Sequence, residues 1–151
     1  MTIDIACEAD VACPADRIFD LITDLGGQDR WLTQSSSFKG TTDVSTERAQ
    51  LGTTYSEPGP FGVRNGVVTE FEPPTRITFH QPMTLKFGAG VLDVKVRYLL
   101  TPTGAGTHVR RVATLGVPRH LVFLRPFVVR ATRIESSRTL AALKGYADVN
   151  G

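Results

Sequence analysis

The chain has 151 residues, 41% of them hydrophobic and 21% charged. This is the size and composition of one globular domain, and it excludes a disordered or fibrous protein. The net charge is only +2, although residues 110–151 hold eight bases against two acids. Such bases are more common on the solvent-facing side of an amphipathic helix than in a nucleic-acid-binding patch. We therefore expect a single domain over residues 1–151 that does not bind nucleic acid.

Several further classes of protein are excluded by missing motifs. The apolar runs, such as residues 121–124, are no longer than four residues, far shorter than the roughly 18 residues of a membrane span. Residues 1–10 lack the basic and apolar regions of a secretory signal, so we expect a cytoplasmic protein. Cys7 and Cys13 have no partner pair at a zinc spacing, which predicts reduced thiols and no metal site. Without a phosphate-binding glycine loop or a Ser-His-Asp motif, we expect no cofactor and no covalent catalysis.

The first third of the chain predicts one strand and two short helices. Apolar and polar residues alternate over residues 2–11, as in a half-buried strand. Pro14 stands where a first helical residue belongs, and an apolar stripe follows it to Ile22. Asp24 is suited to cap a second short helix that runs to Trp31.

The middle of the chain predicts an antiparallel meander, because short alternating segments follow one another through tight turns. Two prolines and two glycines make residues 57–62 a loop, and Pro73 and Pro74 end a strand sharply. Pro82 interrupts the alternation that Met83 and Phe87 continue. The expected strands are residues 38–44, 52–56, 63–72, 75–81, 91–101 and 107–116, with a ragged strand edge at 83–87.

The last part of the chain predicts one long amphipathic helix. Pro118 opens it, and Pro126 either starts the regular helix or kinks it. Apolar residues recur at intervals of three and four residues through Tyr146, which is typical of a helix with one buried face. The residues expected on that face are Phe127, Ala131, Ile134 and Ala141, flanked by Leu124, Val128 and Leu140.

This order of elements and four local phrases resemble a known superfamily. The phrases are Ala12-Cys13-Pro14-Ala15 with Ile18-Phe19 and Asp24; Trp31; Val68 to Pro74 leading into Arg76-Ile77-Thr78-Phe79; and Tyr98 to Pro102 followed by Gly104, Gly106 and Thr107. The chain is similar to START-like proteins of the polyketide cyclase/dehydrase and lipid-transport type, in the SRPBCC superfamily that includes birch-pollen-allergen-like proteins. The resemblance implies an α+β helix-grip fold, with a curved antiparallel sheet of about seven strands around a long C-terminal helix and two short helices after strand one.

Such a fold leaves a hollow between sheet and helix, and the useful question is which polar side chains face it. Strict alternation along the last strand places Arg111 inward, where it should meet a carboxylate or a ligand with an acidic or carbonyl group. A bulge would instead let Arg111 reach water. His80 alternates onto the outer face unless Pro82 turns it toward the cavity mouth. Arg111, His80 and Tyr55 are the catalytic candidates.

The apolar lining of the hollow is expected to come from large side chains on several elements, unless these simply fill the core. The Pro-Gly-Pro-Phe-Gly loop is a candidate lid. The expected ligand-binding residues are Trp31, Phe38, Tyr55, Phe61, Phe79, Met83, Phe87, Tyr98, Arg111, Phe127 and Ile134.

Three functions remain open from the sequence. The first is binding of a small hydrophobic ligand, such as a lipid, polyketide or isoprenoid, with Arg111 at its polar end. The second is a cofactor-independent cyclase or dehydratase that uses the same cavity. The third is a module that binds a protein partner or a membrane surface through residues 121–129. A homodimer is compatible with each.

Overall fold

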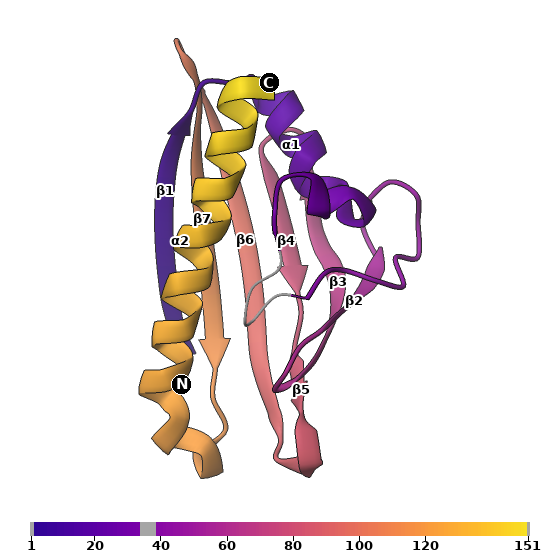
Figure 1. Cartoon of the computed structure of the whole chain (residues 1–151), viewed down its shortest axis with the longest axis vertical. Helices are drawn as coiled ribbons and strands as arrows, with labels where there is room; N and C mark the ends of the chain where they lie inside the picture. Colours follow the sequence, from indigo (N-terminus) through magenta and orange to yellow (C-terminus); the bar gives the residue numbers. More distant parts are fainter. Residues whose placement is uncertain (1, 34–38, 151) are drawn as a thin grey trace.

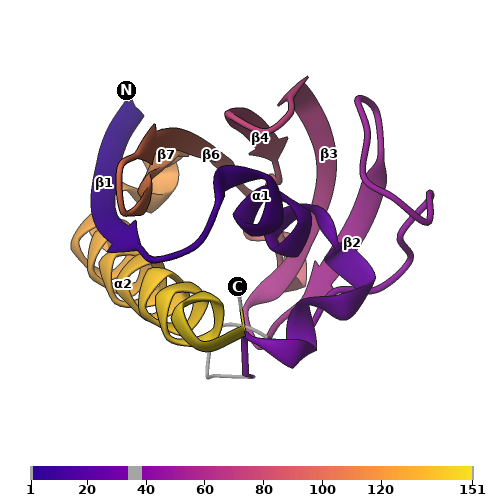
Figure 2. The ribbon, with the colours of Figure 1, turned by 90° about the horizontal axis from the view of Figure 1, so that it is seen from above.

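The computed structural model describes residues 2–33 and 39–150, and its main feature is a seven-stranded antiparallel sheet bent around the last helix (Figures 1 and 2). The sheet order is β1-β7-β6-β4-β3-β2, and the short β5 pairs with β3 and β6. The strands are β1 (Thr2–Val11), β2 (Thr54–Pro58), β3 (Gly62–Glu72), β4 (Arg76–His80), β5 (Met83–Leu85), β6 (Val91–Thr103) and β7 (Gly106–Gly116). The helices are α1 (Ala15–Thr23) and α2 (Arg125–Asn150), with 3₁₀ segments η1 (Leu25–Arg30), η2 (Lys86–Gly88) and η3 (Arg119–Leu124). This is the predicted α+β helix-grip arrangement.

The pairs that β7 forms with β1 and β6 keep an uninterrupted register, which fixes the faces of their side chains. In β7, Arg111 lies opposite Cys7 of β1 and Tyr98 of β6. The register shift in this sheet occurs elsewhere, between Val68 and Glu70 of β3. Because side chains alternate strictly along an unbroken strand, Arg111 shares the inner face of β7 with Val109. The inward orientation expected from alternation is therefore observed.

The core lies between the inner face of the sheet, α1 and the second half of α2. Ile18 and Ile22, one turn apart on α1, are almost fully buried, as is Ile77 of β4. From α2, Leu143 and Ala147 enter the same core. Each fully buried large aliphatic side chain stabilises the fold by about 1.5–3 kcal/mol relative to exposure.

The long helix begins where one of the two sequence alternatives places it. α2 starts at Arg125, so Pro126 occupies its first turn, where the missing N–H has no helical partner to lose. The segment from Pro118 onward is the separate 3₁₀ helix η3. Pro126 thus marks a boundary between two helices and not a kink within one.

The expected buried face of α2 was wrong. Phe127, Ala131, Ile134 and Ala141 are all exposed. Figure 1 shows the first turns of α2 extending past the start of β1, and in these turns Val128 and Val129, not Phe127, pack against the core. The stripe that does face the sheet contains two small hydroxyl side chains, which apolar periodicity does not detect. Its buried residues are Ser136, Thr139, Leu140, Leu143 and Ala147.

Two other boundary predictions were wrong around β2. Glu57 and Pro58 belong to β2, and Gly62 begins β3, so the loop is only residues 59–61. Pro58 fits because it ends a strand at the edge of the sheet. Gly62 fits because a Cβ there would lie 2.2 Å from the carbonyl oxygen of Thr84 on β5.

The strand expected over residues 38–44 is not observed in its described part. Residue 38 lies outside the described residues, and the described portion holds one isolated bridge, between Thr42 and Ser56. The ragged edge after Pro82 becomes β5 followed by η2.

Candidate functional site

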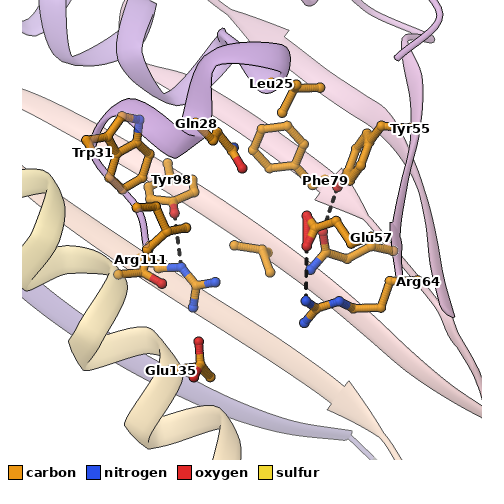
Figure 3. A pocket seen from close by; sticks show the side chains of 14 residues that line it. Leu25, Gln28, Trp31, Tyr55, Glu57, Arg64, Phe79, Tyr98, Arg111 and Glu135 are labelled. Carbon is orange, nitrogen blue, oxygen red and sulfur yellow. Dashed lines mark hydrogen bonds and ion pairs between the residues drawn. The ribbon is translucent and has the colours of Figure 1, made fainter. Parts of the chain in front are cut away.

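A small cavity lies between the sheet, η1 and the middle of α2 (Figure 3). Its volume is about 70 Å³, and polar and apolar groups contribute about equally to its wall. The 14 lining residues are Leu25, Gln28, Trp31, Leu32, Tyr55, Glu57, Arg64, Phe79, Gln81, Val96, Tyr98, Arg111, Glu135 and Thr139. They come from η1 and the residues after it, β2, β3, the end of β4, β6, β7 and α2.

Arg111 is the central cation of this cavity. Its Nε donates to the hydroxyl of Tyr98 at 3.1 Å, and its Nη1 donates to the hydroxyl of Ser136 on α2. The guanidinium carbon also lies 5.7 Å from the centre of the Tyr98 ring, within reach of a cation–π interaction. Arg111 is half-buried, yet among the described residues no carboxylate lies within ion-pair distance of it. Its contacts position the charge without neutralising it.

A buried ion pair forms the opposite side of the cavity. Glu57 and Arg64 face each other across the β2–β3 pair, and Arg64 Nη2 lies 3.0 Å from Glu57 Oε2. Burial raises the pKa of Glu57, and the guanidiniums of Arg64 and Arg111 counteract part of this rise. Arg64 Nε is buried and has no hydrogen-bond partner in the described structure. The pair therefore leaves one buried donor unsatisfied beside the cavity.

Aromatic side chains form the apolar wall. The rings of Tyr55 and Phe79 meet edge-to-face with centroids 5.9 Å apart, and Phe79 and Tyr98 do so at 6.3 Å. Gly66 allows this, because a Cβ there would lie 2.1 Å from the Tyr55 ring. The Tyr55 hydroxyl donates to Gln81 Oε1 at 2.6 Å, and burial raises the pKa of that hydroxyl. Tyr55 is thus a fixed, protonated donor.

Trp31 covers the cavity beside η1. Its indole N–H donates to the carbonyl of Leu21 at 3.3 Å, which ties it to α1. Leu25 and Gln28 of η1 extend the same wall. Trp31 is the single tryptophan of the chain, so its indole signal reports on the cavity.

Five of the predicted ligand-binding residues line this cavity, and five others among the described residues do not. Phe38 lies outside the described residues. Met83 is half-buried away from the cavity, whereas Phe61, Phe87, Phe127 and Ile134 are exposed by 69%, 101%, 78% and 55%. Phe61 and Phe87 lie in connections between strands, and Phe127 and Ile134 lie on exposed positions of α2, so apolar character alone does not place these side chains in the cavity. The five that line the cavity are Trp31, Tyr55, Phe79, Tyr98 and Arg111.

His80 is not among the residues that line the cavity. It stays on the outer face, as alternation expects, and its Nε2 lies 2.6 Å from Asp93 Oδ1 of β6. Pro82 does not turn it inward, so its nomination as a catalytic residue is not supported by its position. Within the described residues, no three His, Cys, Asp or Glu side chains cluster as a metal site requires.

Sequence reasoning missed most of the polar lining. Glu57 was assigned to a loop, which hid its position on the same strand face as Tyr55. Extending the 52–56 strand by two residues would have paired Glu57 with Arg64, a cross-strand ion pair visible in the sequence. The missed polar residues are Gln28, Glu57, Arg64, Gln81, Glu135 and Thr139.

Comparison with known proteins agrees with this architecture. Residues 2–148 match the family described as polyketide cyclase/dehydrase and lipid transport. The chain belongs to this family. No protein of curated function matches it. No helix among the described residues is long and apolar enough to cross a membrane.

Solved structures show the same fold at low sequence identity. Protein MLL2253 from Mesorhizobium loti has a TM-score of 0.73 and 17% identity, over 99% of both chains. The solution structure of the Aha1 dimer from Colwellia psychrerythraea has a TM-score of 0.70 and 16% identity, also over 99% of both chains. DynU16, from the dynemicin biosynthetic locus, has a TM-score of 0.68 and 17% identity over 97% of this chain and 47% of its own.

Proposed function

We propose that this protein binds a small, mainly apolar molecule that carries a carbonyl or carboxylate oxygen. The observation that carries the proposal is Arg111, a half-buried cation whose polar contacts in the described structure are the hydroxyls of Tyr98 and Ser136. A desolvated guanidinium favours an oxygen acceptor, and a carboxylate most of all. The family match and the aromatic wall support an apolar body for the ligand.

The size of the cavity limits what it holds. A volume of about 70 Å³ is well below the roughly 300–1,000 Å³ of pockets for drug-sized ligands. The cavity therefore suits a compact group, such as one ring or a short branched chain with its oxygen. A longer lipid or polyketide would enter with one end only, or would require α2 and η1 to move apart.

A second candidate function is cofactor-independent cyclisation or dehydration in the same cavity. One observation favours it: the carboxyl of Glu57 is buried at the cavity wall, and its pKa is raised by burial. A carboxyl with a raised pKa is suited to give a proton to a carbonyl oxygen or take one from carbon near neutral pH. Arg111 would polarise the same oxygen. Turnover that is lost in Glu57→Gln while binding persists would support this function.

The test uses benzoate and toluene, which share a ring but differ in the carboxylate. The ¹H–¹⁵N spectrum of the labelled protein contains one indole resonance, from Trp31, and its shift reports binding. We expect benzoate to shift it at lower concentration than toluene. Arg111→Met should weaken benzoate binding about tenfold or more, consistent with loss of a charged hydrogen bond, and leave toluene binding nearly unchanged.

The neighbouring Arg110 provides the matched control. It lies on the outer face of the same strand, with its Nε 3.9 Å from Glu8, so Arg110→Met should leave both titrations unchanged. Equal loss of benzoate binding in the two variants would contradict the proposal. So would a benzoate shift that survives Arg111→Met.

The oligomeric state is a separate proposal. The similar structure from Colwellia psychrerythraea is described as a dimer, and we propose that this chain also forms a homodimer. Light scattering after size-exclusion chromatography, at increasing protein concentration, tests this. A mass of one chain at every concentration would contradict it.

A further inference from the structure

Four exposed phenylalanines gather at the end of the molecule that holds the start of α2. Figure 1 shows the β2–β3 turn, the β5–β6 connection and η3 all at this lower end. These segments contain Phe61, Phe87 and Phe123, and Phe127 follows in the first turn of α2. Their exposures are 69%, 101%, 72% and 78%. We call these four residues the phenylalanine patch.

Two hydrogen bonds hold the three segments together. The backbone N–H of Lys86 donates to the carbonyl of Phe61 at 3.0 Å, which joins the β2–β3 turn to η2. His120 Nε2 lies 2.7 Å from the carbonyl oxygen of Ala89, which joins η3 to the β5–β6 connection. The segments that carry the exposed rings are therefore joined to one another, although they are far apart in the sequence.

The backbone at Phe87 is unusual for an aromatic residue. Its φ is 62° and its ψ is 25°, in the left-handed region that bulky side chains rarely adopt. The same residue is fully exposed, so no packing of its ring offsets the strain. Strained residues that persist in folded proteins concentrate at sites with a function. The η2 turn holds this ring away from the protein.

The charge around the patch has one sign. The segments 59–63, 83–92 and 117–134 contain five basic residues and no acidic one. Among the described residues, none of the five forms an ion pair. Asp93, just beyond the second segment, is paired with His80. The five are Lys86, Arg119, Arg125, Arg130 and Arg133.

We propose that this end of the molecule docks on an anionic lipid surface. Exposed aromatic rings insert at the boundary between headgroups and acyl chains, and unpaired basic residues bind the lipid phosphates. A second copy of the chain fits the patch less well, because a twofold contact would bring the two sets of five cations together. The proposal does not depend on the ligand of the cavity.

The experiment is co-sedimentation of the full chain with two kinds of vesicle, one of phosphatidylcholine alone and one of equal parts phosphatidylcholine and phosphatidylglycerol. We expect binding to the anionic vesicles that weakens as salt is raised, and little binding to the neutral ones. Phe87→Ser with Phe123→Ser, and separately Arg119→Glu with Arg130→Glu, should each reduce the bound fraction at least about fivefold.

Matched controls lie outside the patch. Leu51→Ser removes another exposed apolar side chain, 65% exposed, and Arg48→Glu reverses another exposed charge. Both should bind anionic vesicles as the unchanged protein does, and circular dichroism should show every variant folded. Equal binding to both vesicle types, or no binding to either, would overturn the proposal. A protein dimer that dissociates in the phenylalanine variant, without vesicle binding, would overturn it in favour of a second copy.

Discussion

The two halves of α2 have opposite surroundings. From Ser136 to Ala147 the helix presents a continuous buried stripe to the sheet, and Leu143 is completely buried. From Arg125 to Ile134 only Val128 and Val129 pack against the core, whereas Phe127 is 78% exposed and Ile134 is also exposed. Figure 2 shows the helix crossing the open side of the curved sheet. One helix thus holds the fold together with its second half and leaves its first half available for contacts outside the chain.

The largest effect is expected in the buried half. Leu143→Ala should lower the free energy of unfolding by about 2–5 kcal/mol, because it removes a fully buried side chain and leaves a cavity. Urea denaturation followed by circular dichroism measures this. A loss below about 1 kcal/mol would mean that the second half of α2 is not part of the core.

The ion pair of Glu57 and Arg64, which lines the same cavity as Thr139 of this half, should respond almost as strongly. Arg64→Ala should lower the free energy of unfolding by about 3 kcal/mol, because Glu57 is left as an uncompensated buried carboxylate. The double variant Glu57→Gln with Arg64→Met, which removes both charges, should recover part of that loss in the same urea experiment. If the double variant were less stable than Arg64→Ala, the charges of Glu57 and Arg64 would not stabilise each other as the structure indicates.

The pH dependence of the free energy of unfolding tests whether the pKa of Glu57 is raised in the folded protein. Burial raises the pKa of Glu57 in the folded protein above its unfolded value of 4.5, so the folded state holds this proton more tightly. The contribution of Glu57 to stability therefore falls as pH rises from the unfolded pKa through the folded one. In Glu57→Gln nothing titrates at this position. The free energy of unfolding of this variant, relative to that of the unchanged protein, should therefore increase between pH 4.5 and pH 7. Paired urea titrations measure this difference, and a decrease over that range would contradict the raised pKa.

The smallest effect is expected in the exposed half. Phe127→Ala should change the free energy of unfolding by no more than about 0.5 kcal/mol, as is usual for a surface position. The measurement is the urea titration used for Leu143→Ala. A loss of about 2 kcal/mol or more would show that Phe127 is covered in solution and would remove the contrast between the two halves.

Sequence reasoning succeeded where one physical rule acts alone. Arg111 was placed correctly because β7 has no bulge near it, so simple alternation determines its face. The buried face of α2 was not predictable in this way. Ser136 and Thr139 are buried because they lie over Arg111 and the cavity, a tertiary reason that apolar periodicity does not contain.

The polar lining was only partly accessible to sequence reasoning. The opposite charges of Glu57 and Arg64 suit a pair on neighbouring strands, but the prolines and glycines between them predict a loop. Gln81 follows β4, and its role depends on the position of Tyr55 on another strand. Recognition of the superfamily supplied the helix-grip arrangement but not these contacts.

The most direct test of the cavity as a binding site is native mass spectrometry of the protein purified from its own organism, alongside its Arg111→Met variant. We expect the unchanged protein to carry one small apolar molecule with a carbonyl or carboxylate group, which extraction would identify, and the variant to lose it. A protein without any bound molecule, or one that holds the same molecule equally well without Arg111, would contradict the proposed function.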